Sequence, residues 1–403
     1  MLHDKKLKIK KKWSFWWLLY LGVLPIESAA LTLYFSKPIG QYLSFAFNLV
    51  AILVAFKKIL EKKQTNKTSL SQKYTLYFLF MILIYFFGSI IHEEFAFSRV
   101  LSLVCLLGYY LLIIRGYDSI DAILSDINKA LLFTVLISFL FYILGNDNVL
   151  YMENATNQCF KGVVPNRNTF SEISLFYITT SFCLFCKKKM SFLTFGITSI
   201  IALYTTILTK SATSIICLIV LIGLLVVIKK KSIMNFCFSK FFWVAYLSIF
   251  VLLVLVRSTE LVSYIAGSFG KSVTMTGRST IWVTAIDLIK DAPLFGYGYD
   301  STVLLSNGIR ENDPHNGILY ILLTSGLLGV ILLVVMLRPL FVNESKDLEN
   351  DRLTYRSMRL FVIVWLIRGL VESVFSYTHF VFWCAVIFMD LLSKKAVRGI
   401  YEQ

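Results

Sequence analysis

The stretch that decides the fold is "GILYILLTSGLLGVILLVVML", residues 317–337, which contains no charged side chain. A helix needs about 20 predominantly apolar residues to cross the hydrocarbon core of a bilayer. Of the chain's 403 residues, 57% are hydrophobic, and the mean hydropathy is +0.72. A soluble chain has roughly 45–50% apolar residues. The composition therefore predicts an integral membrane protein.

Apolar runs recur along the whole chain, each close to the length of about 20 residues that a span requires. They cover residues 13–35, 39–56, 74–91, 98–114, 130–145, 170–186, 191–209, 212–228, 241–256, 317–337, 358–375 and 377–393. Three of them, at 39–56, 130–145 and 212–228, are short for a span. The pattern predicts an all-α membrane protein, a single domain over residues 1–403 with about twelve transmembrane helices.

The basic residues indicate the orientation in the membrane. The chain has 40 Lys and Arg against 24 Asp and Glu, a net charge of +16. If the basic segment 4–12 stays in the cytoplasm, alternation of the spans places most other basic loops there too, as multispanning proteins prefer. Both termini are then cytoplasmic. Because the positive charge lies in short inside loops, it predicts topology and no nucleic-acid partner.

The sequence predicts no cleaved signal peptide and no disulfide framework. The first apolar run is longer than a signal sequence requires, and it carries Pro25 and Glu27 where a cleavage site would need small residues. Only Cys159 of the seven cysteines falls in a predicted outside loop. Cys183 and Cys186 form a CxxC at the inner end of a run, without further metal ligands nearby.

Two predicted outside segments, about 146–169 and 257–315, interrupt the succession of short loops. Loops this long usually carry function. Within the second, the periodicity predicts an amphipathic helix with Trp282 on its apolar face and Asp287 on its polar face, ended by Pro293. We expect this helix to lie on the outer membrane surface over a cavity. The alternative is a strap that merely connects two spans.

The polar residues before the run at 317–337 predict a helix start at the outer surface. Asp313 suits the N-cap and Pro314 the first helical position. His315 and Asn316 would then lie in the first turn, where free backbone N–H groups and the helix dipole favour an anion. A solvent-facing loop residue is the alternative for His315.

These residues carry a resemblance. His315 and Asn316, then nine residues, then Gly326-Leu-Leu-Gly329 resemble the signature of the O-antigen ligase and Wzy polymerase superfamily. The upstream block "GRSTIW…DAPLFGYGYDS" is similar to the other block that this family shares. "PNRN" (165–168) and "LTKSATS" (208–214) resemble its weaker features. The two glycines would also let another helix pack closely.

The resemblance implies a GT-C-like membrane glycosyltransferase that uses no nucleotide sugar, metal or other cofactor. Its donor would be a glycan on undecaprenyl pyrophosphate. A polymerase passes the growing chain to a fresh lipid-linked repeat unit, with a flippase and a chain-length regulator as further partners. A ligase passes it to a lipid A core or another acceptor. The Lys-, Ile-, Asn- and Phe-rich composition is typical of an AT-rich genome, such as that of a Gram-positive bacterium without lipid A, and therefore favours the polymerase. A lipid-linked-oligosaccharide flippase is a third possibility.

This reaction needs cations that stabilise a departing pyrophosphate. Arg278 is the first candidate, because a guanidinium can grip phosphate through two hydrogen bonds. Lys210, between two apolar runs, and Arg167, in "PNRN", are candidates for substrate binding. For each of the three, the alternative is a surface charge reaching towards lipid headgroups or solvent.

His315 could accept the proton of the attacking hydroxyl, since imidazole titrates near neutral pH, or it could donate to the pyrophosphate. Asn316 would orient it or bind sugar. Arg368 and Glu372, four residues apart in an apolar run, predict a mutual ion pair facing the cavity, with direct substrate binding as the alternative. Exposed aromatic residues such as Tyr299 could stack on sugars or anchor the chain at the interface.

Overall fold

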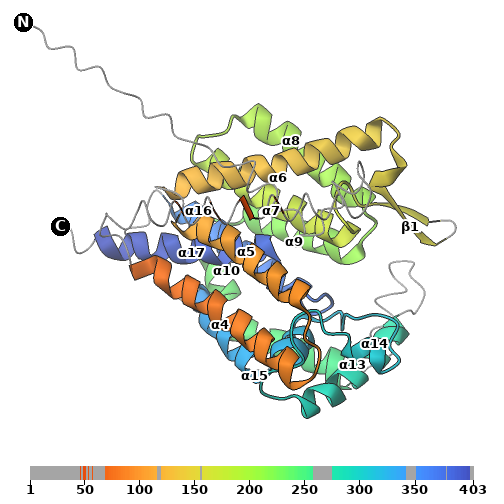
Figure 1. The fold of residues 1–403 in the computed structure, drawn as a ribbon. Coiled ribbons are helices and arrows are strands. Elements are labelled where there is room, and N and C mark those ends of the chain that lie inside the picture. Colours follow the sequence, from red (N-terminus) through yellow and green to blue (C-terminus); the bar gives the residue numbers. More distant parts are fainter. Residues whose placement is uncertain are drawn as a thin grey trace, which may run out of the picture.

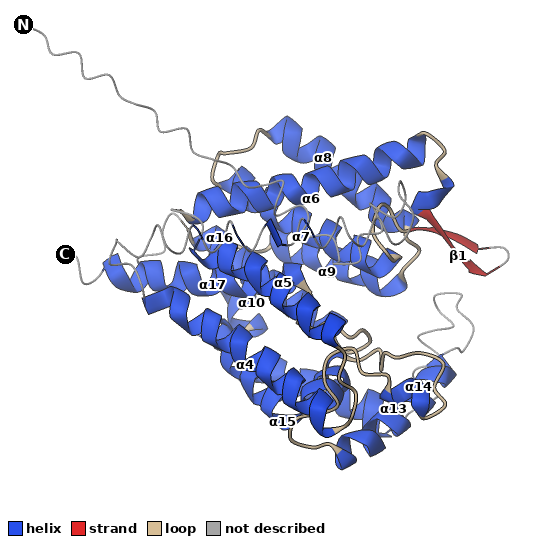
Figure 2. Ribbon diagram, in the orientation of Figure 1, coloured by secondary structure: helices blue, strands red, loops and turns tan. Residues whose placement is uncertain are grey.

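The computed structural model describes residues 69–115, 119–154, 157–256, 275–341, 351–377 and 379–399, and the isolated positions 46, 49, 50, 53 and 57. Helices make up nearly all of it, and the described strands form a single hairpin (Figures 1 and 2). The predicted runs at 13–35 and 39–56 lie outside these residues, apart from isolated positions. Each of the other ten predicted runs falls on a helix, which confirms the all-α class.

The first half of the described chain contains α4 (Ser69–Ile91), α5 (Phe97–Arg115), α6 (Ile120–Ile143), η1 (Asp147–Val149), α7 (Arg167–Cys186), α8 (Phe192–Leu208) and α9 (Ala212–Val226). The second half contains α10 (Lys231–Cys237), α11 (Lys240–Phe250), the π-helix η2 (Val251–Val256), α13 (Met275–Asp291), α14 (Val303–Ser306), α15 (Gly317–Met336), η3 (Arg338–Phe341), α16 (Arg352–Arg368) and α17 (Phe380–Gly399). The strands β1 (Leu150–Asn154) and β2 (Asn157–Phe160) pair antiparallel.

Four of the described helices are long and apolar enough to cross a membrane: residues 74–91 of α4, and the whole of α6, α7 and α15. A fifth span results if α10 and α11, bent by 44° at their junction, count as one. The protein is thus a multi-pass membrane protein. The total of twelve spans stays a prediction.

Helix α16 lies at the centre of the bundle, where it packs against α7, α9 and α17 (Figure 1). Almost every described side chain of α16 and α17 is buried, including Trp365 and Trp383. Helix α4 packs on α5 and α15, and α13 packs on α15. Since α16 contacts several helices at once, its last turn is a natural meeting point for side chains from different parts of the sequence.

One end of the bundle is joined by an ion-pair cluster. Lys187, just after α7, contacts Asp351 at the start of α16 and lies 2.7 Å from Asp121 in the first turn of α6. The end of α7 therefore lies level with the starts of α6 and α16. The start of α7 and the end of α16 must then lie at the opposite end. This agrees with the alternation that the topology prediction requires.

Helix α15 is broken in its middle by the segment 293–298. Gly326 has φ 61° and ψ −160°, a conformation that only glycine adopts readily. The segment fills the break with backbone hydrogen bonds: Tyr297 N–H donates to Leu323 C=O (2.8 Å), and Leu327 N–H donates to Pro293 C=O (2.8 Å). Backbone groups released by the break are thus satisfied, as an apolar environment requires.

The prediction that Gly326 lets a helix pack closely is therefore wrong. A Cβ there would lie 2.3 Å from the carbonyl carbon of Leu294, so the close neighbour is the loop after α13. Gly296 in this loop has φ 63° and would place a Cβ 2.6 Å from Leu323 O. Both glycines allow a close approach of two backbones, but the segment that approaches α15 is a loop and not a helix.

Helix α13 confirms the predicted amphipathic helix. Trp282 and Ala285 are buried, whereas Asp287 is exposed, and the helix ends at Asp291 before Pro293. Its N-terminal flank, residues 257–274, lies outside the described residues. The placement of α13 on a membrane surface stays a prediction.

Candidate functional site

The connection between α16 and α17, residues 369–379, receives hydrogen bonds from helices that are distant in sequence. Leu370 C=O accepts from the side-chain amide of Asn316 (2.9 Å). Val371 C=O accepts from Nη1 of Arg278 (3.0 Å). Because α13 and α15 are both tied to this connection, two of the predicted site residues converge on it.

Asn316 is the N-cap of α15. Its backbone is extended, with φ −154° and ψ 126°, and its side-chain oxygen accepts from the N–H groups of Ile318 and Leu319, each at 3.0 Å. The side chain is fully buried. The observed bonds make Asn316 a residue that positions the start of α15, and its predicted contact with a sugar stays a prediction.

The predicted start of this helix, with Asp313 as N-cap and Pro314 in the first turn, is wrong by three residues. His315 has φ 49°, which lies outside the right-handed helical region and forces the helix to begin after it. Asp313 instead accepts from the His315 N–H (2.7 Å) and from the hydroxyl of Ser373. It thereby joins the loop to the α16–α17 connection.

His315 lies in this loop, with its side chain 24% exposed. Its Nε2 contacts the carboxylate of Glu311, and its Nδ1 lies 4.0 Å from Asp313. The indole of Trp282 donates to Pro314 C=O (2.8 Å) and holds the loop on α13. His315 is therefore beside an acidic loop at the same end of the bundle as Arg278, and its predicted role stays a prediction.

Arg278 faces Glu372 in the α16–α17 connection. Nη2 of Arg278 lies 3.8 Å from Oε1 of Glu372, with the two side chains 25% and 13% exposed. The side-chain amide of Asn168, in the first turn of α7, donates to the other oxygen of Glu372 (3.3 Å). The guanidinium is thus held at one edge and partly open to solvent.

Arg368 is buried beside Glu172 of α7, with Nη2 3.2 Å from Oε1 and the two side chains 1% and 8% exposed. The predicted mutual ion pair of Arg368 and Glu372 is therefore wrong. Helix α16 ends at Arg368, and although the Glu372 N–H still donates to Arg368 C=O (3.1 Å), the two side chains have different partners. Arg368 turns towards α7 and α9, and Glu372 turns towards α13.

His379 is the other partner of Glu172. Its Nδ1 lies 3.0 Å from Oε2 of Glu172, and its Nε2 lies 2.9 Å from Ser373 C=O. Burial lowers the pKa of His379, which lies in the connection before α17, but the Glu172 carboxylate outweighs burial and raises this pKa above 6.5. Both ring nitrogens face acceptors, which favours the doubly protonated form of the ring.

Two of the weaker sequence motifs meet in space at this cluster. Ser211 of "LTKSATS" donates to the side-chain oxygen of Asn168 of "PNRN" (3.0 Å). Arg368 donates to Ser214 (3.3 Å) and to the backbone oxygen of Asn168 (3.2 Å). The starts of α7 and α9 are thus joined to the end of α16 through these polar residues.

Arg167 and Lys210 flank this cluster. Nη1 of Arg167 lies 3.1 Å from Sγ of Cys159 on β2, which directs the guanidinium towards the hairpin. Lys210 is exposed in the turn between α8 and α9, with φ 51°. Their predicted contacts with substrate stay predictions.

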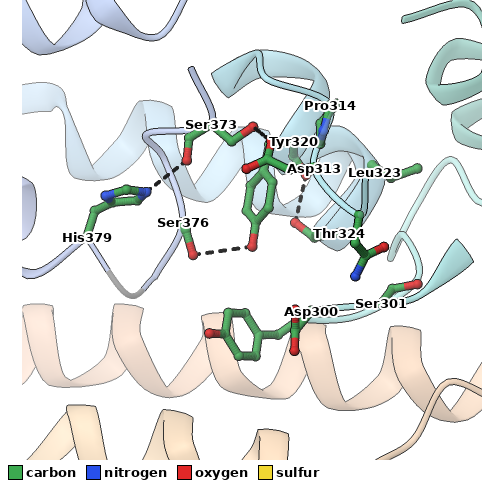
Figure 3. A pocket seen from close by; sticks show the side chains of 12 residues that line it. Asp300, Ser301, Asp313, Pro314, Tyr320, Leu323, Thr324, Ser373, Ser376 and His379 are labelled. Atoms are coloured by element: carbon green, nitrogen blue, oxygen red, sulfur yellow. Dashed lines mark hydrogen bonds between the residues drawn. The ribbon is translucent and has the colours of Figure 1, made fainter. Parts of the chain in front are cut away.

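A cavity of about 260 Å³ lies on the other side of the α16–α17 connection. Figure 3 shows Ser373, Ser376 and His379 on one wall and Ser301, Leu323 and Thr324 on the other, with Tyr320 between them. The remaining lining residues are Tyr299, Asp300, Asn312, Asp313 and Pro314. The described lining does not include His315.

Several residues of this site were not identified from the sequence: Asn168, Glu172, Ser373 and His379. Glu172 is an ionisable residue inside the predicted run 170–186, and such residues are usually paired or functional in membranes. That signal was available. The polar positions of "RGLVESVFSYTH" (368–379) gave a second signal, but only the fold shows that His379 returns to Glu172.

Chemically, the site offers two guanidinium groups, Arg278 and Arg368, and the imidazole of His379, which lines a polar cavity. Such groups can stabilise the charge of a diphosphate and orient a neighbouring sugar. Among the described residues, no three His, Cys, Asp or Glu side chains gather in a way that could hold a metal ion.

Comparison of the sequence with known proteins found a matching family model and similar relatives. Residues 197–334 match the family model described as O-antigen ligase. The chain is 25% identical to the exopolysaccharide production protein ExoQ of Rhizobium meliloti over 235 residues, which cover 53% of each chain. It is 30% identical to the O-antigen ligase of Pseudomonas aeruginosa over 125 residues, 30% of this chain and 29% of that one.

The matches thus span about half the length of the first relative and less than a third of the second. No protein of solved structure matches the chain significantly. The matched segment includes Arg278, His315 and Asn316. The matched segment and both relatives thus support a likeness to the superfamily of O-antigen ligases and Wzy-type polymerases.

Proposed function

We propose that the protein is a polysaccharide polymerase on the outer face of the bacterial cytoplasmic membrane, with both termini in the cytoplasm. The growing glycan leaves its undecaprenyl pyrophosphate carrier and joins a fresh lipid-linked repeat unit. The bond between the anomeric carbon and the pyrophosphate oxygen breaks, and a glycosidic bond to the acceptor hydroxyl forms. The hydroxyl proton passes to His315 or to the departing pyrophosphate, and undecaprenyl pyrophosphate is released.

The observation that carries this proposal is the position of Arg278. Its guanidinium is 25% exposed, is held at one edge by Val371 C=O, and faces Glu372, which is joined through Asn168 to the buried Arg368. We assign the leaving pyrophosphate to this guanidinium. His315 acts on the acceptor hydroxyl or the pyrophosphate from the adjoining loop, and Asn316 positions that loop. Arg167 and Lys210 bind the outer parts of the substrate, and no metal or other cofactor takes part.

A ligase is the second candidate, because the matching family model and one of the relatives are named O-antigen ligase. It would use the same donor and the same pyrophosphate site with a different acceptor. A flippase is the alternative from another class of protein, the transporters, and it would need no transferase site.

The test is a transfer assay with purified protein in detergent, where no membrane has to be crossed. Lipid-linked repeat units extracted from the producing cells are the only substrate. We expect a ladder of products from the wild type, none from His315→Ala, and a loss of at least about 100-fold from Arg278→Lys, since lysine lacks the planar fork of arginine. Chelator should leave the ladder unchanged.

Lys290→Ala is the matched control, because Lys290 lies on the exposed face of the same helix and pairs only with Asp287 among described residues. It should leave the ladder unchanged. If the wild type consumes the donor only when a different glycolipid acceptor is added, the ligase is correct. If it forms no glycosidic bond but moves lipid-linked units across vesicles, the transferase proposal fails.

A further inference from the structure

We propose that the 260 Å³ cavity is a subsite for one sugar ring of the glycan, and that it selects a ring without a carboxylate or phosphate group. The proposal rests on the proposed function. It adds the chemical class of the sugar that lies next to the reacting bond.

The walls of the cavity suit a sugar ring. Tyr299 and Tyr320 provide aromatic surface on which the C–H face of a sugar can pack, and Thr324, Ser373 and Ser376 provide hydroxyl groups (Figure 3). The Tyr320 hydroxyl is held 3.3 Å from Ser376. These groups come from three segments whose backbones are tied together, so the shape of the cavity is fixed before a ligand enters.

The carboxylates of Asp300 and Asp313 are suitable acceptors for sugar hydroxyls. Asp313 receives the His315 N–H and the Ser373 hydroxyl through Oδ1 alone, which leaves Oδ2 for a ligand. Asp300 is part of the segment anchored at Thr302, whose N–H donates to Glu94 (3.0 Å). The Asp313 carboxylate is therefore in place before a ligand enters, and the backbone next to Asp300 is held.

The same two carboxylates disfavour an acidic sugar. The one cation that lines the described cavity is His379, and both of its ring nitrogens are already engaged with Glu172 and Ser373 C=O. Arg99 lies near the rim, with Nε 3.9 Å from Asp300. A uronic acid ring would thus meet two carboxylates, and among the described lining residues only His379 could carry a positive charge towards its own carboxylate.

The cavity adjoins the proposed pyrophosphate site. Ser373 lines the cavity, and the preceding residue, Glu372, faces Arg278. A ring bound in the cavity is therefore separated from the diphosphate-binding guanidinium by a single turn of backbone.

The experiment uses saturation-transfer NMR on the purified full-length protein in detergent, with methyl glucoside and methyl glucuronide as probes. These probes share one ring and differ in the carboxylate. We expect saturation of the glucoside to exceed that of the glucuronide at least roughly fivefold, the size of a like-charge contact at about 4 Å in a water-like environment. In Asp313→Asn the difference should shrink, and in Asp300→Asn, Asp313→Asn combined it should disappear. Asp287→Asn, on the exposed face of α13, should keep the wild-type difference.

Equal saturation of both probes by the wild type, or saturation of neither, overturns the proposal. If Asp313→Asn does not fold, Asp300→Asn alone still tests the proposal, because the Asp300 side chain is 64% exposed and its substitution should not affect folding. The transfer assay is independent of this result. A glucoside preference without a product ladder would reject the transferase and keep the sugar subsite, whereas a ladder without the preference would reject the subsite alone.

Discussion

The contact between Arg278 and Glu372, at 3.8 Å, is looser than the 3.2 Å contact between Arg368 and Glu172. A diphosphate that bound to Arg278 would have to compete with this carboxylate for the same guanidinium. Two opposite charges at about 4 Å interact by roughly 1 kcal/mol in a water-like environment. Glu372 is thus expected to weaken the binding of anions rather than to support it.

Glu372→Gln should therefore bind a diphosphate more tightly. The amide keeps the size of the side chain and its contact with Asn168, but it removes the competing charge. We expect inorganic pyrophosphate to inhibit transfer at a concentration about five times lower than in the wild type, which corresponds to roughly 1 kcal/mol. The measurement is the inhibition constant in the transfer assay.

Asp287→Asn controls for the general loss of one negative charge, since Asp287 lies on the exposed face of α13. Its inhibition constant should equal that of the wild type. A weaker inhibition in Glu372→Gln would mean that the carboxylate positions Arg278 for the anion, and the competition argument would then be wrong.

His379 predicts a dependence of stability on pH. Its pKa is raised above 6.5 in the folded protein, because Glu172 outweighs burial. A raised folded-state pKa adds stability that is complete below the unfolded value and is lost as the pH rises through the folded value. The melting temperature in detergent should therefore fall as the pH rises above about 6.5, and the melting temperature of His379→Gln should fall less. Equal slopes for both proteins would remove His379 as the cause.

At this scale the sequence identified Arg278, His315, Asn316, Arg368 and Glu372, which all lie at one end of the bundle. Their partners were not predictable. The spacing of Arg368 and Glu372 suggested one helical face, but α16 ends at Arg368. Glu172 and His379 lie 207 residues apart in the chain, and only the packing of α7 beside α16 and α17 brings them together.

At the scale of the elements, the break in α15 decides how the long loop is held. Gly326→Ala would place a Cβ 2.3 Å from Leu294, at φ 61°. We expect a destabilisation of at least about 2–3 kcal/mol, from the strained backbone and the clash together. The segment 293–298 would lose its hydrogen bonds to α15, and Tyr299 and Asp300 directly after it would lose their position. Thermal unfolding in detergent measures the first effect, and methyl glucoside binding measures the second.

Gly223→Ala is the matched control. Gly223 lies in the interior of α9, and a Cβ there would meet no atom within 4 Å. Alanine favours a helix over glycine by about 0.5–1 kcal/mol, so this variant should be as stable as the wild type or slightly more stable. Equal effects of the two substitutions would show that the break does not depend on glycine.

Hydropathy alone located ten of the described helices, because each apolar run has the length of a helix and its ends are polar. It could not reveal that α15 is broken, since the run 317–337 is apolar throughout. The glycines in it were a correct signal of close approach, but the approaching partner depends on tertiary packing. The N-cap of α15 was misplaced for a local reason, the left-handed conformation of His315.

At the scale of the whole molecule, the chain separates its charges between two ends. Lys187, Lys189, Asp121 and Asp351 form one cluster, and Arg278, Arg368, Glu172 and Glu372 form the other. Helix α7 joins the two, with Glu172 near its start and Lys187 just after its end. Whichever side one cluster faces, the other therefore faces the opposite side.

The charge pattern predicts that the Lys187 cluster is cytoplasmic, and single cysteine substitutions can test this on the complete protein. Asn307 and Lys188 are both exposed, in the loop after α14 and in the turn after α7. In intact cells, a membrane-impermeant maleimide should label Asn307→Cys above the wild-type background and should not label Lys188→Cys. After the cells are opened, both should be labelled. The reverse labelling pattern would mean that the protein has the opposite orientation in the membrane. The proposed pyrophosphate site would then face the cytoplasm, where an outer-leaflet polymerase could not use it.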